Sequence, residues 1–347
     1  MSIEPHRRFF LLVAFLATVM VSAQQDSPPQ KPVSSRIFLD VVVTPKSGQP
    51  VRDLLEQDFT ILDNGAQQKI ASFQAVEGSH SPVDVILLID AVNAGYSILS
   101  FEREQVGQFL RANGGHLAQP TSLAILTGTG TQIQEGFSVD GNTLSASLEQ
   151  YDMDLRNTPR SASFYGQAER YQLSLKALEE LAVRETPRPG RKIMIWVSPG
   201  WPILTGHSIT MDDKQQQHIF GNVVGFSNLL RRGRITLYSI DPLGAGDAAV
   251  RTLYWKDYVK GISKPSQVEA GNLALEVLAT QSGGLVLNDN NDVAALVREC
   301  LADTSAFYEI SFDAPVGDPP HKYHHLEVRL AKPGLIARTR QGYYSQP

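Results

Sequence analysis

A carboxylate at the end of a buried strand is the first candidate for chemistry in this chain. The segment Val83–Gly95 reads VDVILLIDAVNAG, and its apolar first half, which ends at Asp90, is typical of a strand buried on both faces of a parallel sheet. In open α/β sheets, ligands bind at the carboxyl ends of the strands. The carboxylate of Asp90 could hold a divalent cation there, cap a backbone turn or pair with Asn93.

Polar or turn-forming residues also follow other predicted strands of the same region. Asp241 ends the apolar run 235–240, and the strand Lys192–Val197 runs into a turn. The clearest helical pattern, Ser163–Val183, begins at a serine that could face the same edge. We therefore expect a binding site at the carboxyl edge of the sheet, made by Asp90, Asn93, Ser163, Pro199, Gly200, Trp201 and Asp241.

Catalytic signatures are missing from the sequence, although a pair of carboxylates such as Asp90 and Asp241 would suit a hydrolase. The chain has no Gly-x-Ser-x-Gly elbow, no His-Glu-x-x-His pattern and no phosphate loop. The single cysteine, Cys300, lies in an apolar helical pattern and is interpreted as a buried hydrophobic residue. The sequence therefore predicts a protein that is not an enzyme.

Three histidines near the C-terminal end could bind zinc or copper. On a strand, however, His321 and His325 would share one face while His324 points away from them. The interpretation we favour is a solvated turn that enters a strand.

Composition argues for a globular protein and against a nucleic-acid partner. The 347 residues carry a net charge of −5 with 42% hydrophobic and 19% charged residues, and the longest basic clusters are pairs. A chain of this length predicts about two domains.

The N-terminal residues have the pattern of an export signal. Arg7 and Arg8 precede an apolar run, Phe9–Val21, and small residues suggest cleavage after Ala23. Residues 1–23 are thus expected to be a signal peptide and 24–35 a proline-rich linker, with an uncleaved anchor as the alternative. We expect export to the periplasm or the medium, by the general or the twin-arginine route, and no membrane span after cleavage.

The hydrophobic pattern divides the rest of the chain into three parts. The sequence predicts short strands with turns in residues 36–77 and 304–347. In residues 82–303 it predicts strands that alternate with helices, and Ser100 is expected to cap the first of these helices. The predicted fold class is α/β, with a doubly wound, mostly parallel sheet of the Rossmann type. The two terminal segments are expected to form one β-sandwich-like unit, into which the central domain is inserted.

Taken together, these segments resemble the secreted von Willebrand factor A-related proteins of acidobacteria. The resemblance rests on Phe38–Val43, Gln57–Gly65, the Asp90 loop and Thr339–Tyr344. It implies a von Willebrand factor A-like central fold, export, and a role in adhesion or protein binding. In that family an Asp-x-Ser-x-Ser loop holds a divalent cation, usually magnesium.

The metal site of the family is incomplete in this chain. Asp90 matches, but Val92 and Ala94 stand at the two serine positions, and Pro199 precedes Gly200 where the family has aspartate. The resemblance leaves a candidate Mg²⁺ set of Asp90, Ser161 and Ser163.

The sequence thus predicts an exported, non-catalytic protein-binding or adhesion module with a degenerate metal-ion-dependent adhesion site, no resident cofactor and an unknown protein partner. Two alternatives are a structural scaffold subunit of an envelope complex and an intact metal-dependent adhesion domain.

Overall fold

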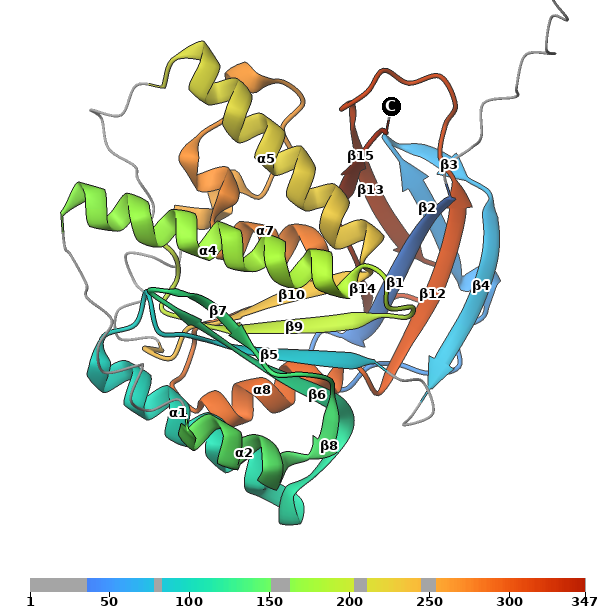
Figure 1. Ribbon diagram of the computed structural model, residues 1–347. Helices are drawn as coiled ribbons and strands as arrows, with labels where there is room; N and C mark the ends of the chain where they lie inside the picture. The colour runs from blue at the N-terminus through green and yellow to red at the C-terminus, as the bar shows by residue number, and fades with distance from the viewer. Residues whose placement is uncertain (1–35, 78–82, 151–162, 203–210, 245–253, 347) are drawn as a thin grey trace, which may run out of the picture. The chain divides into compact units, whose positions relative to one another are not determined.

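The computed structural model describes residues 36–77, 83–150, 163–202, 211–244 and 254–346, which are coloured in Figure 1. The expected signal peptide and linker, residues 1–35, lie outside this part of the chain. No helix within the described residues is long and apolar enough to cross a membrane.

A mostly parallel sheet forms the centre of the chain. Its strands follow the order β11-β10-β9-β5-β6-β7, and β8 pairs with β6. β7 and β8 are antiparallel to β6, and the other pairs are parallel. When these six strands are numbered along the chain from β5, without β8, their order read from β7 is 3-2-1-4-5-6. This order confirms the predicted doubly wound class. The bounds are β5 Asp84–Asp90, β6 His116–Thr127, β7 Gly130–Ile133, β8 Ser138–Asp140, β9 Lys192–Val197, β10 Ile235–Ile240 and β11 Val286–Leu287.

Helices cover both faces of this sheet (Figure 1). One hydrophobic core joins the sheet to α1 (Tyr96–Arg111), α2 (Gly141–Gln150) and α8 (Val293–Ala302). The core on the other face includes residues of α4 (Phe164–Glu185), α5 (Asp213–Arg232) and α7 (Leu275–Ser282). Short 3-10 helices complete the connections: η1 Glu56–Asp58, η3 Ala112–Gly115, η4 Tyr254–Tyr258, η5 Pro265–Gln267 and η6 Ala270–Leu273.

The two cores explain the continuous apolar run of β5. Leu87 and Ile89 face one core, whereas Ile86 and Leu88 face the other. A strand covered on both sides has no solvent-facing position, so polar residues are absent between Asp84, where β5 begins, and Asp90, where it ends.

The N- and C-terminal segments form two antiparallel sheets, as the sequence predicts. One has the order β14-β1-β12-β4 and the other β15-β13-β2-β3, so each sheet contains strands from both ends of the chain. Their apolar sides share a third core. The bounds are β1 Arg36–Pro45, β2 Phe59–Asp63, β3 Ala66–Gln68, β4 Ile70–Glu77, β12 Ala306–Asp313, β13 Tyr323–Leu330, β14 Leu335–Arg338 and β15 Gly342–Tyr344.

One helix start differs from the expectation. The helix after β5 begins at Tyr96 with Gly95 as its N-cap residue, so Ser100 lies inside the first turns of α1 instead of capping it. The short turn at Asp90 leads directly into the helix, and this tertiary constraint overrides the local preference for a serine cap.

His324 is buried, so the interpretation of its segment as a solvated turn is wrong for this residue. Its side chain is 2% exposed, its Nδ1 lies 2.8 Å from Asp63 Oδ1, and its Nε2 lies 3.1 Å from Asp318 Oδ2. The Tyr343 ring stacks on the imidazole at 4.6 Å, and its hydroxyl donates to Asp63 Oδ2. His321 and His325 are exposed.

Replacing the buried Asp63 is expected to destabilise the terminal sheets strongly. Asp63→Ala leaves the His324 imidazole and the Tyr343 hydroxyl without their acceptor, and breaking such a buried pair costs about 3–5 kcal/mol. Urea unfolding measures the loss. The matched control is His325→Ala on the exposed side of β13, which should change the free energy of unfolding by less than about 0.5 kcal/mol. Similar losses for both variants would contradict the assignment.

Candidate functional site

Asp90 lies at the point where the strand order of the central sheet reverses. β5, which it ends, is the first strand of this sheet along the chain, and its neighbour β9 follows only after β6, β7 and β8, which lie on the other side of β5. The connections from two such strands leave in opposite directions, and ligands of doubly wound proteins bind in the resulting crevice. The structure therefore places Asp90 where the sequence predicts a site.

The Asp90 carboxylate accepts five hydrogen bonds from its own chain. Oδ1 accepts from the backbone N–H groups of Val92, at 3.0 Å, and Asn93, at 2.9 Å. Oδ2 accepts from Asn93 Nδ2 at 2.8 Å, Trp196 Nε1 at 3.0 Å and Ser198 Oγ at 2.9 Å. The side chain is completely buried. A carboxylate offers about four lone-pair sites, so these donors use its accepting capacity fully.

The residues at the family's two serine positions pack into the cores. Val92 contributes to the core beneath α4 and α5, whereas Ala94 contributes to the core on the α1 face. Both are at most 1% exposed. Their apolar side chains therefore stabilise the turn by packing, while Asp90 caps it by accepting the two backbone N–H groups.

Asn93 connects the Asp90 turn to α4. Its Nδ2 donates to Ser174 Oγ at 2.9 Å as well as to Asp90, and the Ser174 hydroxyl donates to the Arg170 carbonyl. Ser174 is fully buried. The carboxylate thus connects β5, β9 and α4 through hydrogen bonds.

The loop after β9 is folded around Ser198. Its hydroxyl donates to Asp90 and accepts from the Gly200 N–H at 3.1 Å, and Gly200 has φ = 92°, which favours glycine. Trp201 packs edge-on against Trp196, with ring centroids 5.0 Å apart, and is only 1% exposed.

These donors do not fit a divalent cation. Mg²⁺ and Ca²⁺ need several oxygen ligands, but Trp196 Nε1 and Asn93 Nδ2 direct hydrogens, not lone pairs, towards Asp90. Within the described residues no group of three His, Cys, Asp or Glu side chains could hold a metal ion.

The other predicted site residues lie in several environments. Ser163 is the N-cap of α4 and accepts from the Gly166 N–H; it precedes Ser174 by about three turns, or about 16 Å. Ser161 lies outside the described residues. Asp241 accepts from the Leu243 N–H at 3.0 Å and is half-buried, whereas Pro199, Gly200 and Trp201 are buried.

Sequence reasoning missed three members of the network: Trp196, Ser198 and Ser174. The available signals were an indole at the end of an otherwise aliphatic strand, followed two residues later by a serine. Ser174 had no signal beyond being a polar residue among the apolar positions of a helix.

No model of a known protein family matches this chain, and no curated protein matches it. Among solved structures, the pilus adhesin SpaC from Lactobacillus rhamnosus GG is similar over 84% of this chain and 48% of its own, with 8% identity and a TM-score of 0.40. The manganese-loaded TRAP protein of Plasmodium vivax covers 78% of this chain and 98% of its own, with 13% identity and a TM-score of 0.34.

The human COPII-coat protein Sec24c is similar over 77% of this chain, with 10% identity and a TM-score of 0.34. This chain spans about half the length of the Sec24c and SpaC chains, at 44% and 48%. At these identities the likeness concerns the fold alone.

Removing the Asp90 carboxylate is expected to reduce stability regardless of metal. Asp90→Ala leaves the Trp196 and Ser198 donors and one N–H of the Asn93 amide buried without an acceptor, and we expect a loss of about 3–5 kcal/mol in the free energy of unfolding. The matched control is Asp140→Ala, because Asp140 accepts from the backbone of Asn142 and Thr143 in a similar turn but is exposed. Its loss should be much smaller.

Calorimetric titration of the wild-type chain with Mg²⁺, Mn²⁺ and Ca²⁺ should give no saturable heat, and a chelator should leave the melting temperature unchanged. The physical reason is that donors of its own chain occupy the Asp90 carboxylate, and the one other buried oxygen beside it, Asn93 Oδ1, is too few ligands for these cations. Saturable binding that Asp90→Ala abolishes would show that the turn rearranges around a metal.

Proposed function

We propose that this chain is an exported, non-catalytic protein-binding module whose carboxyl edge works without a metal ion. The observation that carries the proposal is the Asp90 carboxylate, which is saturated by donors of its own chain at the position where related domains place a cation. A module of this kind would contact its partner through side chains around the network rather than through a bridging ion.

Exposed aromatic side chains supply such contacts near this edge. Tyr165 is 84% exposed, Phe164 is 55% exposed and Tyr96 is 49% exposed. α1 begins directly after the Asp90 turn, and α4 runs back to the start of β9, so the first residues of both helices lie towards the carboxyl ends of the strands (Figure 1). Aromatic residues are enriched in protein interfaces and often carry most of the binding energy.

The buried network has a positioning role in this proposal. It holds the turn after β5, the loop after β9 and α4 in one arrangement before a partner arrives. Binding to a preorganised surface loses less conformational entropy than binding to loops that must order first. Most of the residues that the sequence predicts as contacts would then support the surface from below, because they are buried.

The N-terminal pattern and the resemblance to secreted von Willebrand factor A-related proteins support export and membership of that group. The lack of catalytic signatures in the sequence supports a binding role. The partner expected is a protein whose surface has an apolar pocket that accepts an aromatic ring.

Loss of the Tyr165 ring should weaken partner binding. We expect the immobilised wild-type chain to retain one protein of the envelope or medium in the presence of a chelator. For Tyr165→Ser, the retention of that same protein should fall at least about tenfold, as for an interface hot spot. Quantitative mass spectrometry of the retained fraction measures the difference.

Val183→Ser is the matched control, because Val183 is 55% exposed and lies near the opposite end of α4. It should retain the wild-type amount. Retention that requires Mg²⁺, or that falls equally in both variants, would contradict the proposal.

A further inference from the structure

Arg340 is a buried cation without a partner. Arg340 belongs to the segment that joins β14 to β15. Its side chain is 8% exposed and makes no hydrogen bond or ion pair with any residue of the described part of the chain. Neighbouring arginines differ in this respect: Arg234 pairs with Asp40 and Glu309, and Arg338 pairs with Asp303. A buried charge without a partner is costly, so the surroundings of Arg340 need an explanation.

The charges around Arg340 increase this cost. Burial, together with the nearby Arg231 guanidinium, lowers the pKa of Arg340 to about 10, so the group stays protonated at neutral pH. Asp40 acts in the opposite direction, but its carboxylate already accepts from Arg234. Arg231 brings a second cation, and its Nε has no hydrogen-bond partner among the described residues.

The C-terminal end of α7 is the other source of negative potential. Helix carbonyls at this end carry a partial negative charge. Arg338, however, already donates to the carbonyl oxygen of Gly283, which caps this end, at 2.7 Å. Asp40 and this helix end, the two nearby sources of negative charge, therefore already hold other arginines.

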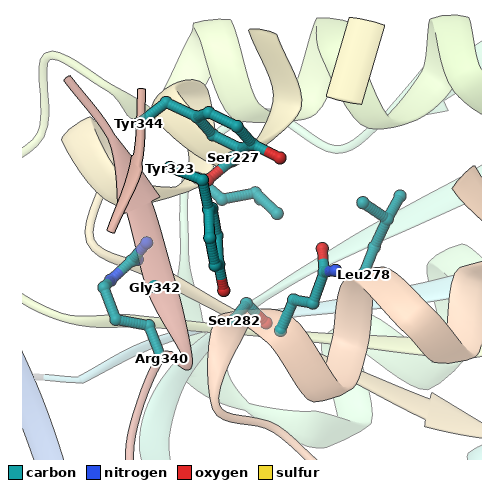
Figure 2. A pocket seen from close by; sticks show the side chains of 9 residues that line it. Ser227, Leu278, Ser282, Tyr323, Arg340, Gly342 and Tyr344 are labelled. Atoms are coloured by element: carbon teal, nitrogen blue, oxygen red, sulfur yellow. The ribbon is translucent and has the colours of Figure 1, made fainter. Parts of the chain in front are cut away.

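A small cavity adjoins Arg340. Its volume is about 20 Å³, which is room for about one water molecule or one monatomic ion and too little for a phosphate or sulfate. The lining side chains come from α5, α7, β13 and the segment around β15 (Figure 2); they are Ser227, Leu230, Leu278, Gln281, Ser282, Tyr323, Arg340, Gly342 and Tyr344.

Ser227 supplies a second donor to this cavity. Its hydroxyl donates to no other residue in the parts of the chain that the structure describes, and it lines the same space as Arg340. The tyrosine hydroxyls of the lining donate elsewhere: Tyr323 to the Gln341 carbonyl and Tyr344 to the Ile262 carbonyl. Arg340 and Ser227 both line this space, and a guanidinium and a hydroxyl are groups that can hold a halide.

We propose that this cavity binds a halide ion, chloride under ordinary conditions, with Arg340 as its charge partner and Ser227 as a hydrogen-bond donor. A water molecule could fill the space but could not neutralise the guanidinium. The ion would lie where α5 and α7 of the central domain meet β13 and β15 of the terminal sheets, and it would therefore stabilise their packing.

Thermal unfolding of the full chain tests the proposal. Sodium gluconate, whose anion is too large for the cavity, is replaced stepwise by sodium chloride at constant ionic strength. The wild-type melting temperature should rise saturably by about 2–4 °C, because the ion binds only the folded state. Arg340→Met should show no chloride-dependent rise. Arg329→Met, which removes an exposed arginine paired with Glu327, should keep the wild-type response.

Crystals grown in sodium bromide give a second measurement that does not depend on a variant that folds. An anomalous peak in the cavity beside Arg340 is the expected result. An equal chloride response in wild-type and Arg340→Met proteins would overturn the proposal, as would crystals of the wild-type chain with no bromide peak there.

Discussion

The need to compensate one buried negative charge organises the centre of this molecule. Asp90 is excluded from solvent, and a carboxylate in that position is tolerated only when hydrogen bonds replace its hydration. Its donors come from its own turn and from β9, and Asn93 extends the network to α4. These hydrogen bonds fix the turn after β5 and the loop after β9 relative to each other. The same donors that hold the loop also occupy the carboxylate oxygens that a cation would need.

The apolar residues beside Asp90 act with this network. Successive positions of β5 face different cores, but the turn that follows breaks this alternation, because Val92 and Ala94 are two residues apart and still pack in different cores. Serines at these positions would place hydroxyl groups among aliphatic side chains, where no cation would compensate their burial. Apolar residues at these two positions therefore fit a carboxylate whose oxygens are already occupied.

The sequence predicts the fold class well because the class follows from local patterns: continuous apolar runs for strands buried on both faces, and amphipathic runs for the helices between them.

The Asp90 and Asn93 pair was also predictable, since residues three apart meet within one turn. Trp196 and Ser198 were not, because their contact with Asp90 depends on strand order. Ser163 was a cap signal, whereas the helix contacts Asn93 through Ser174. The burial of His324 depends on the pairing of β13 with β2, which no local pattern encodes.

The mixed origin of the terminal sheets has a consequence for biosynthesis. Arg36 in β1 pairs with Asp313 in β12, 277 residues later, and β2 pairs only with β3 and β13 among the described strands. β1 and one edge of β2 therefore stay unpaired until β12 and β13 have been made, and closing so long a loop is entropically costly. Chains that stop before residue 306 would keep those edges open, which is the condition that favours association between chains and degradation.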